Sequence, residues 1–178
     1  MVKYIYRTIK LYVKSLLNKN HITFKFPIKI ANNVIISAKN NGRISFGKHV
    51  SVCANVHIAV VKNGLISIGG YTGISDNSII VSHNSITIGD NVMIGPNVCI
   101  YDHDHVFRCE GVMRNMGYVT APVVIEDNVW IGAGAIILKG VSIGTGSVIA
   151  AGTVVNRDIP ANSIVYNKRC LEIKSKFD

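Results

Sequence analysis

The sequence predicts an all-β protein folded as a parallel β-helix, a triangular solenoid of about six coils. Three observations predict this fold class. Aliphatic residues recur every six positions, smaller or β-branched residues follow them at a fixed offset, and the interruptions come after every third repeat. A period of six fits neither an α-helix nor one long alternating strand, but it fits a short strand and a turn that repeat three times per coil.

The clearest run of repeats lies between residues 125 and 158. The aliphatic position is filled by Ile125, Ile131, Ile137, Ile143, Ile149 and Val155. The smaller residue four positions later is Val129, Ala135, Val141, Ser147 and Thr153. We expect both sets to point into the solenoid, where stacked coils form one continuous apolar interior.

Three further coils are predicted upstream, in the same phase. Their aliphatic positions are Phe46, Val52, Ile58, Ile68, Ile74, Ile80, Ile88, Ile94 and Ile100, and an earlier partial coil holds Ile30 and Ile36. Since every break from Phe46 onward follows a complete coil, the extra residues should leave the prism at one corner. The longest break predicts a protruding loop over about 103–122, and loops on rigid scaffolds commonly carry functional sites.

The ends of a solenoid need caps, which suggests three parts. We expect 1–27 to be an N-terminal amphipathic helix and lead-in, 28–159 to be the β-helix, and 160–178 to be a C-terminal cap or tail. One face of the helix would carry Lys3, Arg7, Lys10 and Lys14. Residues 3–17 would then either touch an anionic membrane surface or pack on the first coil.

The amino-acid composition limits the kinds of ligand and partner that this protein could bind. Hydrophobic residues make up 48% of the 178 residues, which is enough for a sizeable core. The net charge of +9 suits nucleic acid, a membrane surface or an anionic small ligand, but one tryptophan and no aromatic stripe disfavour nucleic acid. The four cysteines lack metal-ligand spacing, and neither a membrane span nor a signal peptide is recognisable, so we expect a reduced, cytoplasmic protein.

Two segments resemble the hexapeptide-repeat acyltransferases: 88–92 (IGDNV) and 128–134 (NVWIGAG). The resemblance covers about 44–162, is most specific over 123–160, and is strongest to the maltose and galactoside O-acetyltransferases and those of capsule and lipopolysaccharide synthesis. It implies a left-handed β-helix, a homotrimer with active sites between subunits, and acetyl-CoA as the acyl donor. No metal cofactor is expected.

The resemblance also implies a catalytic histidine at the start of the protruding loop, and the matching position is His105. A sugar hydroxyl is a poor nucleophile at neutral pH, so a neutral imidazole is needed to take its proton during attack on the thioester. His103 is the alternative base, since it shares a face with His105 if the chain is extended. Asp102 and Asp104 would then face the other way, where one of them could orient an imidazole.

The candidates for acceptor binding are Asp102, His83 and Ser75. His83 precedes His105 by about one coil and is expected at the same corner. Relatives often carry an acidic residue at the position of His83, so the acceptor class is open. A zinc site that joins His83 to the loop histidines is a weaker alternative, because the spacing offers too few further ligands.

The resemblance places acetyl-CoA in a groove along the solenoid. Ala133 and Ala151, one coil apart, match positions near the pantetheine arm, and Asn156 and Arg157 match positions near the nucleotide. A guanidinium suits a CoA phosphate, although Arg157 could equally be a solvated cation. Trp130 lies outside the inward phase and should face outward, at a trimer contact or the CoA groove.

The expected function is acetyl-CoA-dependent O-acetylation of a sugar hydroxyl, by direct transfer, in surface polysaccharide synthesis. The alternatives are an antibiotic or small-sugar acetyltransferase, a sugar-nucleotide N-acyltransferase, and a trimeric β-helix scaffold without catalysis. The aspartate–histidine string 102–105 and the run 123–160 argue against the scaffold.

Overall fold

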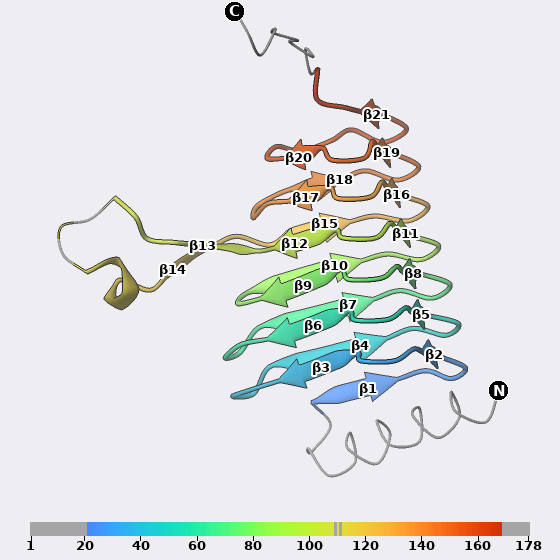
Figure 1. The fold of residues 1–178 in the computed structure, drawn as a ribbon, viewed down its shortest axis with the longest axis horizontal. Helices are drawn as coiled ribbons and strands as arrows, with labels where there is room; N and C mark the ends of the chain where they lie inside the picture. The colour runs from blue at the N-terminus through green and yellow to red at the C-terminus, as the bar shows by residue number, and fades with distance from the viewer. Residues whose placement is uncertain (1–20, 109, 111, 169–178) are drawn as a thin grey trace, which may run out of the picture.

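The computed structural model describes residues 21–168 except 109 and 111. The described chain forms a parallel β-helix, as the repeat predicts, with its coils stacked along one axis (Figure 1). The β-helix is left-handed, as the family resemblance implies. The predicted N-terminal helix, including residues 3–17, and residues 169–178 of the predicted tail lie outside the described residues.

Three parallel sheets form the faces of the prism, here sheets A, B and C. Sheet A contains β1 (Ile22–Phe24), β4 (Arg43–Phe46), β7 (Leu65–Ile68), β10 (Ser85–Ile88), β15 (Val123–Ile125) and β18 (Ser142–Ile143). Sheet B contains β2 (Lys29–Ile30), β5 (Ser51–Val52), β8 (Gly73–Ile74), β11 (Met93–Ile94), β16 (Trp130–Ile131), β19 (Val148–Ile149) and β21 (Ile164–Val165). Sheet C contains β3 (Ile35–Ala38), β6 (His57–Val60), β9 (Ile79–Ser82), β12 (Cys99–Tyr101), β17 (Ile136–Ile137) and β20 (Val154–Val155).

The predicted inward positions form the core. All the aliphatic repeat residues from Phe46 to Val155, and the smaller residues that follow them between 129 and 153, are at most 2% exposed. In-register parallel pairing stacks equivalent positions of successive coils on one another, so each inward side chain extends the same apolar column.

The β-helix reaches beyond the predicted boundaries at both ends. Ile22 in β1 pairs with Ile44 in β4, so the first coil is complete and begins before residue 28. At the other end, β21 lies in the segment expected to be a cap, and it pairs with β19 of the β-helix.

The extra residues between the repeats lie at the corners of the prism. The longer connections of the first coils, 39–42 and 61–64, both run from sheet C to sheet A, as the spacing of the breaks predicts. At the corner between sheets B and C the chain turns through positive φ, at Asn55 (58°) and Asn77 (60°) and, in later coils, at Gly134 and Gly152. Asparagine and glycine tolerate this conformation better than other residues.

The protruding loop is a β-hairpin that leaves the sheet C–sheet A corner after β12 (Figure 1). It pairs β13 (His103–His105) with β14 (Tyr118–Thr120) in antiparallel fashion, and the 3₁₀ turn η1 (Met113–Asn115) lies between them. Only this hairpin departs from the parallel arrangement among the described strands.

Two general features of the described residues bear on the sequence predictions. Within 21–168, no helix is long and apolar enough to cross a membrane. Cys53 and Cys99 are free thiols of intermediate exposure, and burial together with Asp76 raises the pKa of the Cys53 thiol.

Candidate active site

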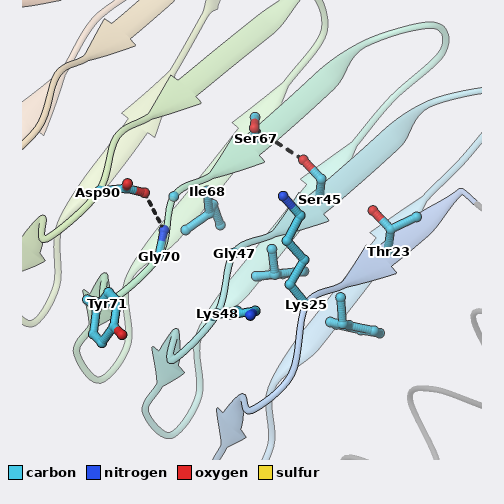
Figure 2. A pocket seen from close by; sticks show the side chains of 13 residues that line it. Thr23, Lys25, Ser45, Gly47, Lys48, Ser67, Ile68, Gly70, Tyr71 and Asp90 are labelled. Atoms are coloured by element: carbon cyan, nitrogen blue, oxygen red, sulfur yellow. Dashed lines mark hydrogen bonds between the residues drawn. The ribbon is translucent and has the colours of Figure 1, made fainter.

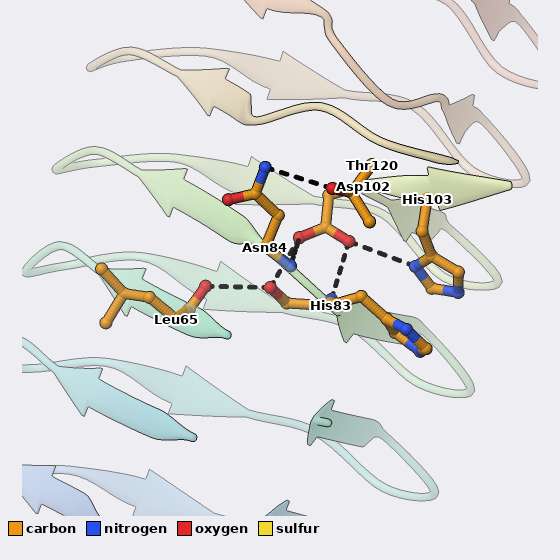
Figure 3. Close-up of polar contacts among 7 residues, drawn as sticks. Leu65, His83, Asn84, Asp102, His103 and Thr120 are labelled. Atoms are coloured by element: carbon orange, nitrogen blue, oxygen red, sulfur yellow. Dashed lines mark hydrogen bonds and ion pairs between the residues drawn. The ribbon is translucent and has the colours of Figure 1, made fainter. Parts of the chain in front are cut away.

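The candidate site lies where the hairpin leaves the solenoid. In the coil below, residues 83 and 84 alone connect β9 to β10, whereas the two earlier connections at this corner are longer. The short turn places backbone amides of one coil directly beneath the first residues after β12 of the next, and those residues are Asp102 and His103 (Figure 3).

The Asp102 carboxylate joins the two coils. Its side chain is fully buried, and its two oxygens accept hydrogen bonds from the Ser82 hydroxyl at 2.6 Å, the His83 amide at 2.8 Å and the Asn84 amide at 2.8 Å. A buried carboxylate is stable only when donors surround it in this way. Asp102 therefore closes the short turn and fixes the root of the hairpin.

A fourth partner of the carboxylate is His103, whose Nδ1 lies 3.1 Å from Asp102 Oδ1 (Figure 3). A carboxylate can only accept, so in a neutral ring this contact places the proton on Nδ1 and leaves Nε2 with a free lone pair. The His103 side chain is 14% exposed, which gives solvent or a ligand limited access to it. Carboxylate–imidazole pairs of this kind orient general bases.

Aromatic contacts complete the cluster. The His83 ring stacks on the His103 ring with centroids 3.9 Å apart, and Tyr118 lies edge-on to His83 at 4.2 Å. Burial and the neighbouring His103 lower the pKa of His83, while the Asp102 charge opposes this shift. Burial, the larger cause, therefore favours the neutral form of His83, whose polar ring atoms can serve as uncharged hydrogen-bonding groups.

His105 lies farther along β13 and is exposed. Its ring packs beside Tyr118 of β14, with centroids 4.5 Å apart. Asp104, between the two histidines, forms an ion pair with Lys139 at 2.8 Å. The strand is extended as the alternation requires, so Tyr118 contacts both His103 and His105.

The structure separates the three residues predicted to bind acceptor. His83 belongs to the cluster, but the Asp102 carboxylate is buried and occupied by protein donors, which argues for a positioning role rather than direct binding. Ser75 follows β8 at the corner between sheets B and C, so a single chain does not bring it to the histidines.

The predicted CoA-binding residues border sheet C. Ala133 and Ala151 are exposed at the corner before this sheet, stacked in successive coils, and the Gly152 amide donates to the Ala133 carbonyl at 2.7 Å. Asn156 and Arg157 are exposed directly after β20, at the corner from which the hairpin leaves. An elongated ligand that touches all four must therefore lie across the outer face of sheet C.

Sequence reasoning did not find Ser82, Asn84 or Tyr118. Ser82 and Asn84 flank His83 in the break between Ile80 and Ile88, which is shorter than the two breaks of ten, and this contrast was the available signal. The sequence offers no signal for Tyr118, because a hairpin pairing decides its position. The described residues contain no group of three or more His, Cys, Asp or Glu side chains arranged to hold a metal ion.

A family model matches two parts of this chain. Residues 76–101 and 122–157 match the model described as the hexapeptide repeat of succinyl-transferase. The two segments are the coils on either side of the hairpin, and the gap between them is the hairpin itself.

Known proteins similar in sequence to this chain include galactoside O-acetyltransferases, putative acetyltransferases and N-acetyltransferases of tetrahydropyridine dicarboxylate. The galactoside O-acetyltransferase of Lactococcus lactis is 41% identical over 102 residues, which cover 57% of this chain and 48% of the relative. A maltose O-acetyltransferase structure from Clostridium difficile is 38% identical, with a TM-score of 0.59 and coverage of 66% of this chain and 62% of that one. A hexapeptide-repeat acetyltransferase from Vibrio cholerae, complexed with acetyl coenzyme A, is 37% identical, with a TM-score of 0.60 and coverage of 66% and 63%. The chain thus spans about half the length of the curated relatives it matches.

Proposed function

We propose, from the membership of this chain in the hexapeptide-repeat acyltransferase family, that it transfers an acetyl group from acetyl-CoA to a sugar hydroxyl. The observation that carries the proposal is the carboxylate-oriented imidazole at the root of the hairpin, with a second, exposed histidine on the same strand. O-acetylation is preferred to N-acylation because the galactoside O-acetyltransferases match 102 residues of this chain, whereas the N-acetyltransferase relatives match 55 or 45.

In the proposed reaction a histidine of β13 removes the proton of the acceptor hydroxyl as its oxygen attacks the thioester carbonyl. The tetrahedral intermediate then collapses, the carbon–sulfur bond breaks, and the imidazolium returns the proton to the leaving CoA thiolate. No covalent enzyme intermediate forms. Family position favours His105 as the base, whereas the Asp102 contact favours His103, whose Nε2 is already oriented.

The donor would lie across the outer face of sheet C. In this arrangement the pantetheine arm passes the exposed backbone at Ala133 and Ala151, and Arg157 meets a CoA phosphate. Active sites would form between subunits of a homotrimer, where the hairpin of one chain meets the coils of the next.

The acceptor in this proposal is a sugar of a surface polysaccharide or of its lipid-linked precursor. We place the reaction in the cytoplasm, where acetyl-CoA is made, with residues 3–17 as a contact to the inner membrane surface. A smaller sugar, an antibiotic or an amino sugar nucleotide is the alternative acceptor, and a scaffold without catalysis is the alternative of another class.

The test is thiol release from acetyl-CoA against a panel of sugars, sugar nucleotides and polysaccharide fragments. It compares the unchanged protein with His105→Ala and His103→Ala. Loss of a general base should lower kcat about 10²–10⁴-fold in the variant that lacks it. His57→Ala, a histidine of sheet C outside the cluster, is the matched control and should leave the rate unchanged.

The outcomes separate the alternatives. A large loss of kcat only in His105→Ala would identify His105 as the base, as its family position suggests. A large loss of kcat only in His103→Ala would identify His103, which is paired with Asp102, as the base. Full activity in both variants would refute a histidine base. A protein that neither binds acetyl-CoA nor releases thiol with any acceptor would instead fit the scaffold.

A further inference from the structure

An open groove of about 530 Å³ lies along the outer face of sheet A, across the first coils (Figure 2). Its walls come from β1, β4 and β7 and from the corner that leads from these strands to sheet B. None of its lining residues belongs to the histidine cluster, which lies at the opposite end of the sheet A strands. Its volume is in the range of sites for small ligands.

Two cations line one end of the groove. Lys25 follows β1 and Lys48 follows β4, and both side chains are exposed. Asp90 contributes the one carboxylate among the lining residues, and its Oδ1 accepts the Gly70 amide hydrogen at 2.6 Å (Figure 2). Each exposed ammonium group can donate to an oxygen of an anion such as a phosphate monoester.

Hydroxyl groups form a row along the middle of the groove. Thr23 pairs with Ser45, and Ser45 pairs with Ser67, so that one hydroxyl comes from each successive coil. The Ser45 hydroxyl donates to the Ser67 hydroxyl at 3.2 Å (Figure 2). Because each hydroxyl can both donate and accept, the row matches the polyhydroxylated face of a sugar.

The end of the groove near sheet B combines a bare backbone with an aromatic ring. A Cβ atom on Gly47 or Gly69 would collide with backbone or aspartate atoms of the next coil, so both positions require glycine and present no side chain. Tyr71, beside it, is 64% exposed and stacks on His49 with centroids 4.6 Å apart. An exposed, supported aromatic ring offers an apolar surface to a sugar ring.

The charge distribution along the chain strengthens the attraction for anions. Residues 1–75 contain eleven lysines and arginines and no aspartate or glutamate, whereas all ten acidic residues follow. The coils that form the groove therefore carry uncompensated positive charge, which raises the local concentration of anionic ligands.

From this combination of cations, hydroxyls and an aromatic ring we infer that the groove binds a phosphate-bearing saccharide. The phosphate lies against Lys25 and Lys48, and the sugar hydroxyls meet the row formed by Thr23, Ser45 and Ser67. The site is distinct from the acceptor position at the histidines, and its occupation requires no acetyl transfer.

The test is isothermal titration calorimetry of the full-length protein, without acetyl-CoA, using glucose 1-phosphate, glucose and inorganic phosphate as probes. Glucose 1-phosphate should bind at least about tenfold more tightly than either other probe. The double variant Lys25→Ser/Lys48→Ser should weaken its binding at least about tenfold. The matched double variant Lys29→Ser/Lys39→Ser removes two exposed lysines outside the groove and should change the affinity less than about twofold.

Several results would overturn the inference. They are no binding of glucose 1-phosphate, equal affinity for inorganic phosphate, and equal weakening in both double variants. Binding to phosphatidylglycerol vesicles that requires Lys25 and Lys48, without binding of glucose 1-phosphate, would assign the groove to lipid headgroups instead. Acetyltransferase activity is measured separately, so its absence would not affect this result.

Discussion

Asp102 and Asp104 differ by two positions and have opposite environments. The Asp102 side chain is buried and accepts four hydrogen bonds, whereas Asp104 is 45% exposed and pairs with Lys139. Removal of a buried, multiply bonded carboxylate leaves several donors unpaired and therefore costs more stability than removal of a surface ion pair. At the residue scale, Asp102 therefore determines both the stability of the corner and the orientation of His103.

Asp102→Asn should destabilise the protein by about 1–3 kcal/mol, because the amide NH₂ would face donors where a carboxylate accepts. It should also lower kcat with little change in KM, since the His103 ring loses its negatively charged partner. Urea unfolding and steady-state kinetics measure the two effects. Asp104→Asn is the control and should cost less than about 0.5 kcal/mol; equal effects of the two variants would contradict the positioning role.

His83 gives the second prediction at this scale. Burial, with His103 beside it, lowers its pKa in the folded state, so the unfolded chain binds the proton more readily. The contribution of His83 to stability is therefore present above the unfolded pKa of about 6.5 and is lost as the pH falls below it. His83→Asn should reduce the loss of stability between about pH 7 and pH 5.

Thermal unfolding across that pH range is the measurement. His57→Asn, in β6 and outside the cluster, provides the comparison. An unchanged pH dependence in His83→Asn would show that other groups cause the loss.

At the element scale, the corner between sheets B and C is built from a ladder of asparagines. The Asn33 side-chain amide donates to Asn55 at 3.2 Å, and the Asn55 amide donates to Asn77 at 3.1 Å. All three have positive φ. Gly134 and Gly152 take the equivalent position in later coils. All coils therefore share the positive-φ backbone conformation at this corner, whereas the side-chain hydrogen bonds are present only where the residue is asparagine.

Replacement of Asn77 separates these two contributions. Asn77→Ala should cost about 1–2 kcal/mol, since alanine is strained at a φ of 60°. Asn77→Gly loses the same hydrogen bond without that strain and should cost about half as much or less. Urea denaturation compares the two variants. If both variants lost the same stability, the hydrogen-bond ladder rather than the backbone would control the corner.

At the scale of the whole molecule, the outer face of sheet B carries an apolar stripe. Met93 pairs with Trp130, Trp130 with Val148, and Val148 with Ile164. Met93, Trp130 and Ile164 are 58%, 51% and 73% exposed in the single chain. A contiguous exposed apolar stripe is typical of a protein–protein interface, and it supports the outward position predicted for Trp130 and the proposed trimer.

Trp130→Glu should therefore dissociate the trimer, because it places a charge in the centre of an apolar interface. Size-exclusion chromatography with light scattering should give three times the subunit mass of 19.3 kDa for the unchanged protein and a lower mass for the variant. Thr87→Glu, an exposed position on sheet A, should leave the mass unchanged. A monomeric unchanged protein would remove the trimer from the proposal.

The sequence by itself determined the solenoid, its inward residues and the corner at which the hairpin leaves, because burial of every sixth side chain imposes the period that the sequence displays. It also placed His103 and His105 at the root of that hairpin. The tertiary structure alone decided that Asp102 bonds to Ser82 and to His103, that His83 stacks on His103, and that Ser75 lies at another corner. These contacts depend on the register between coils and on the direction of each side chain. The lengths of the turns and the pairing of the hairpin together set the register and these directions, and the six-residue period alone does not encode them.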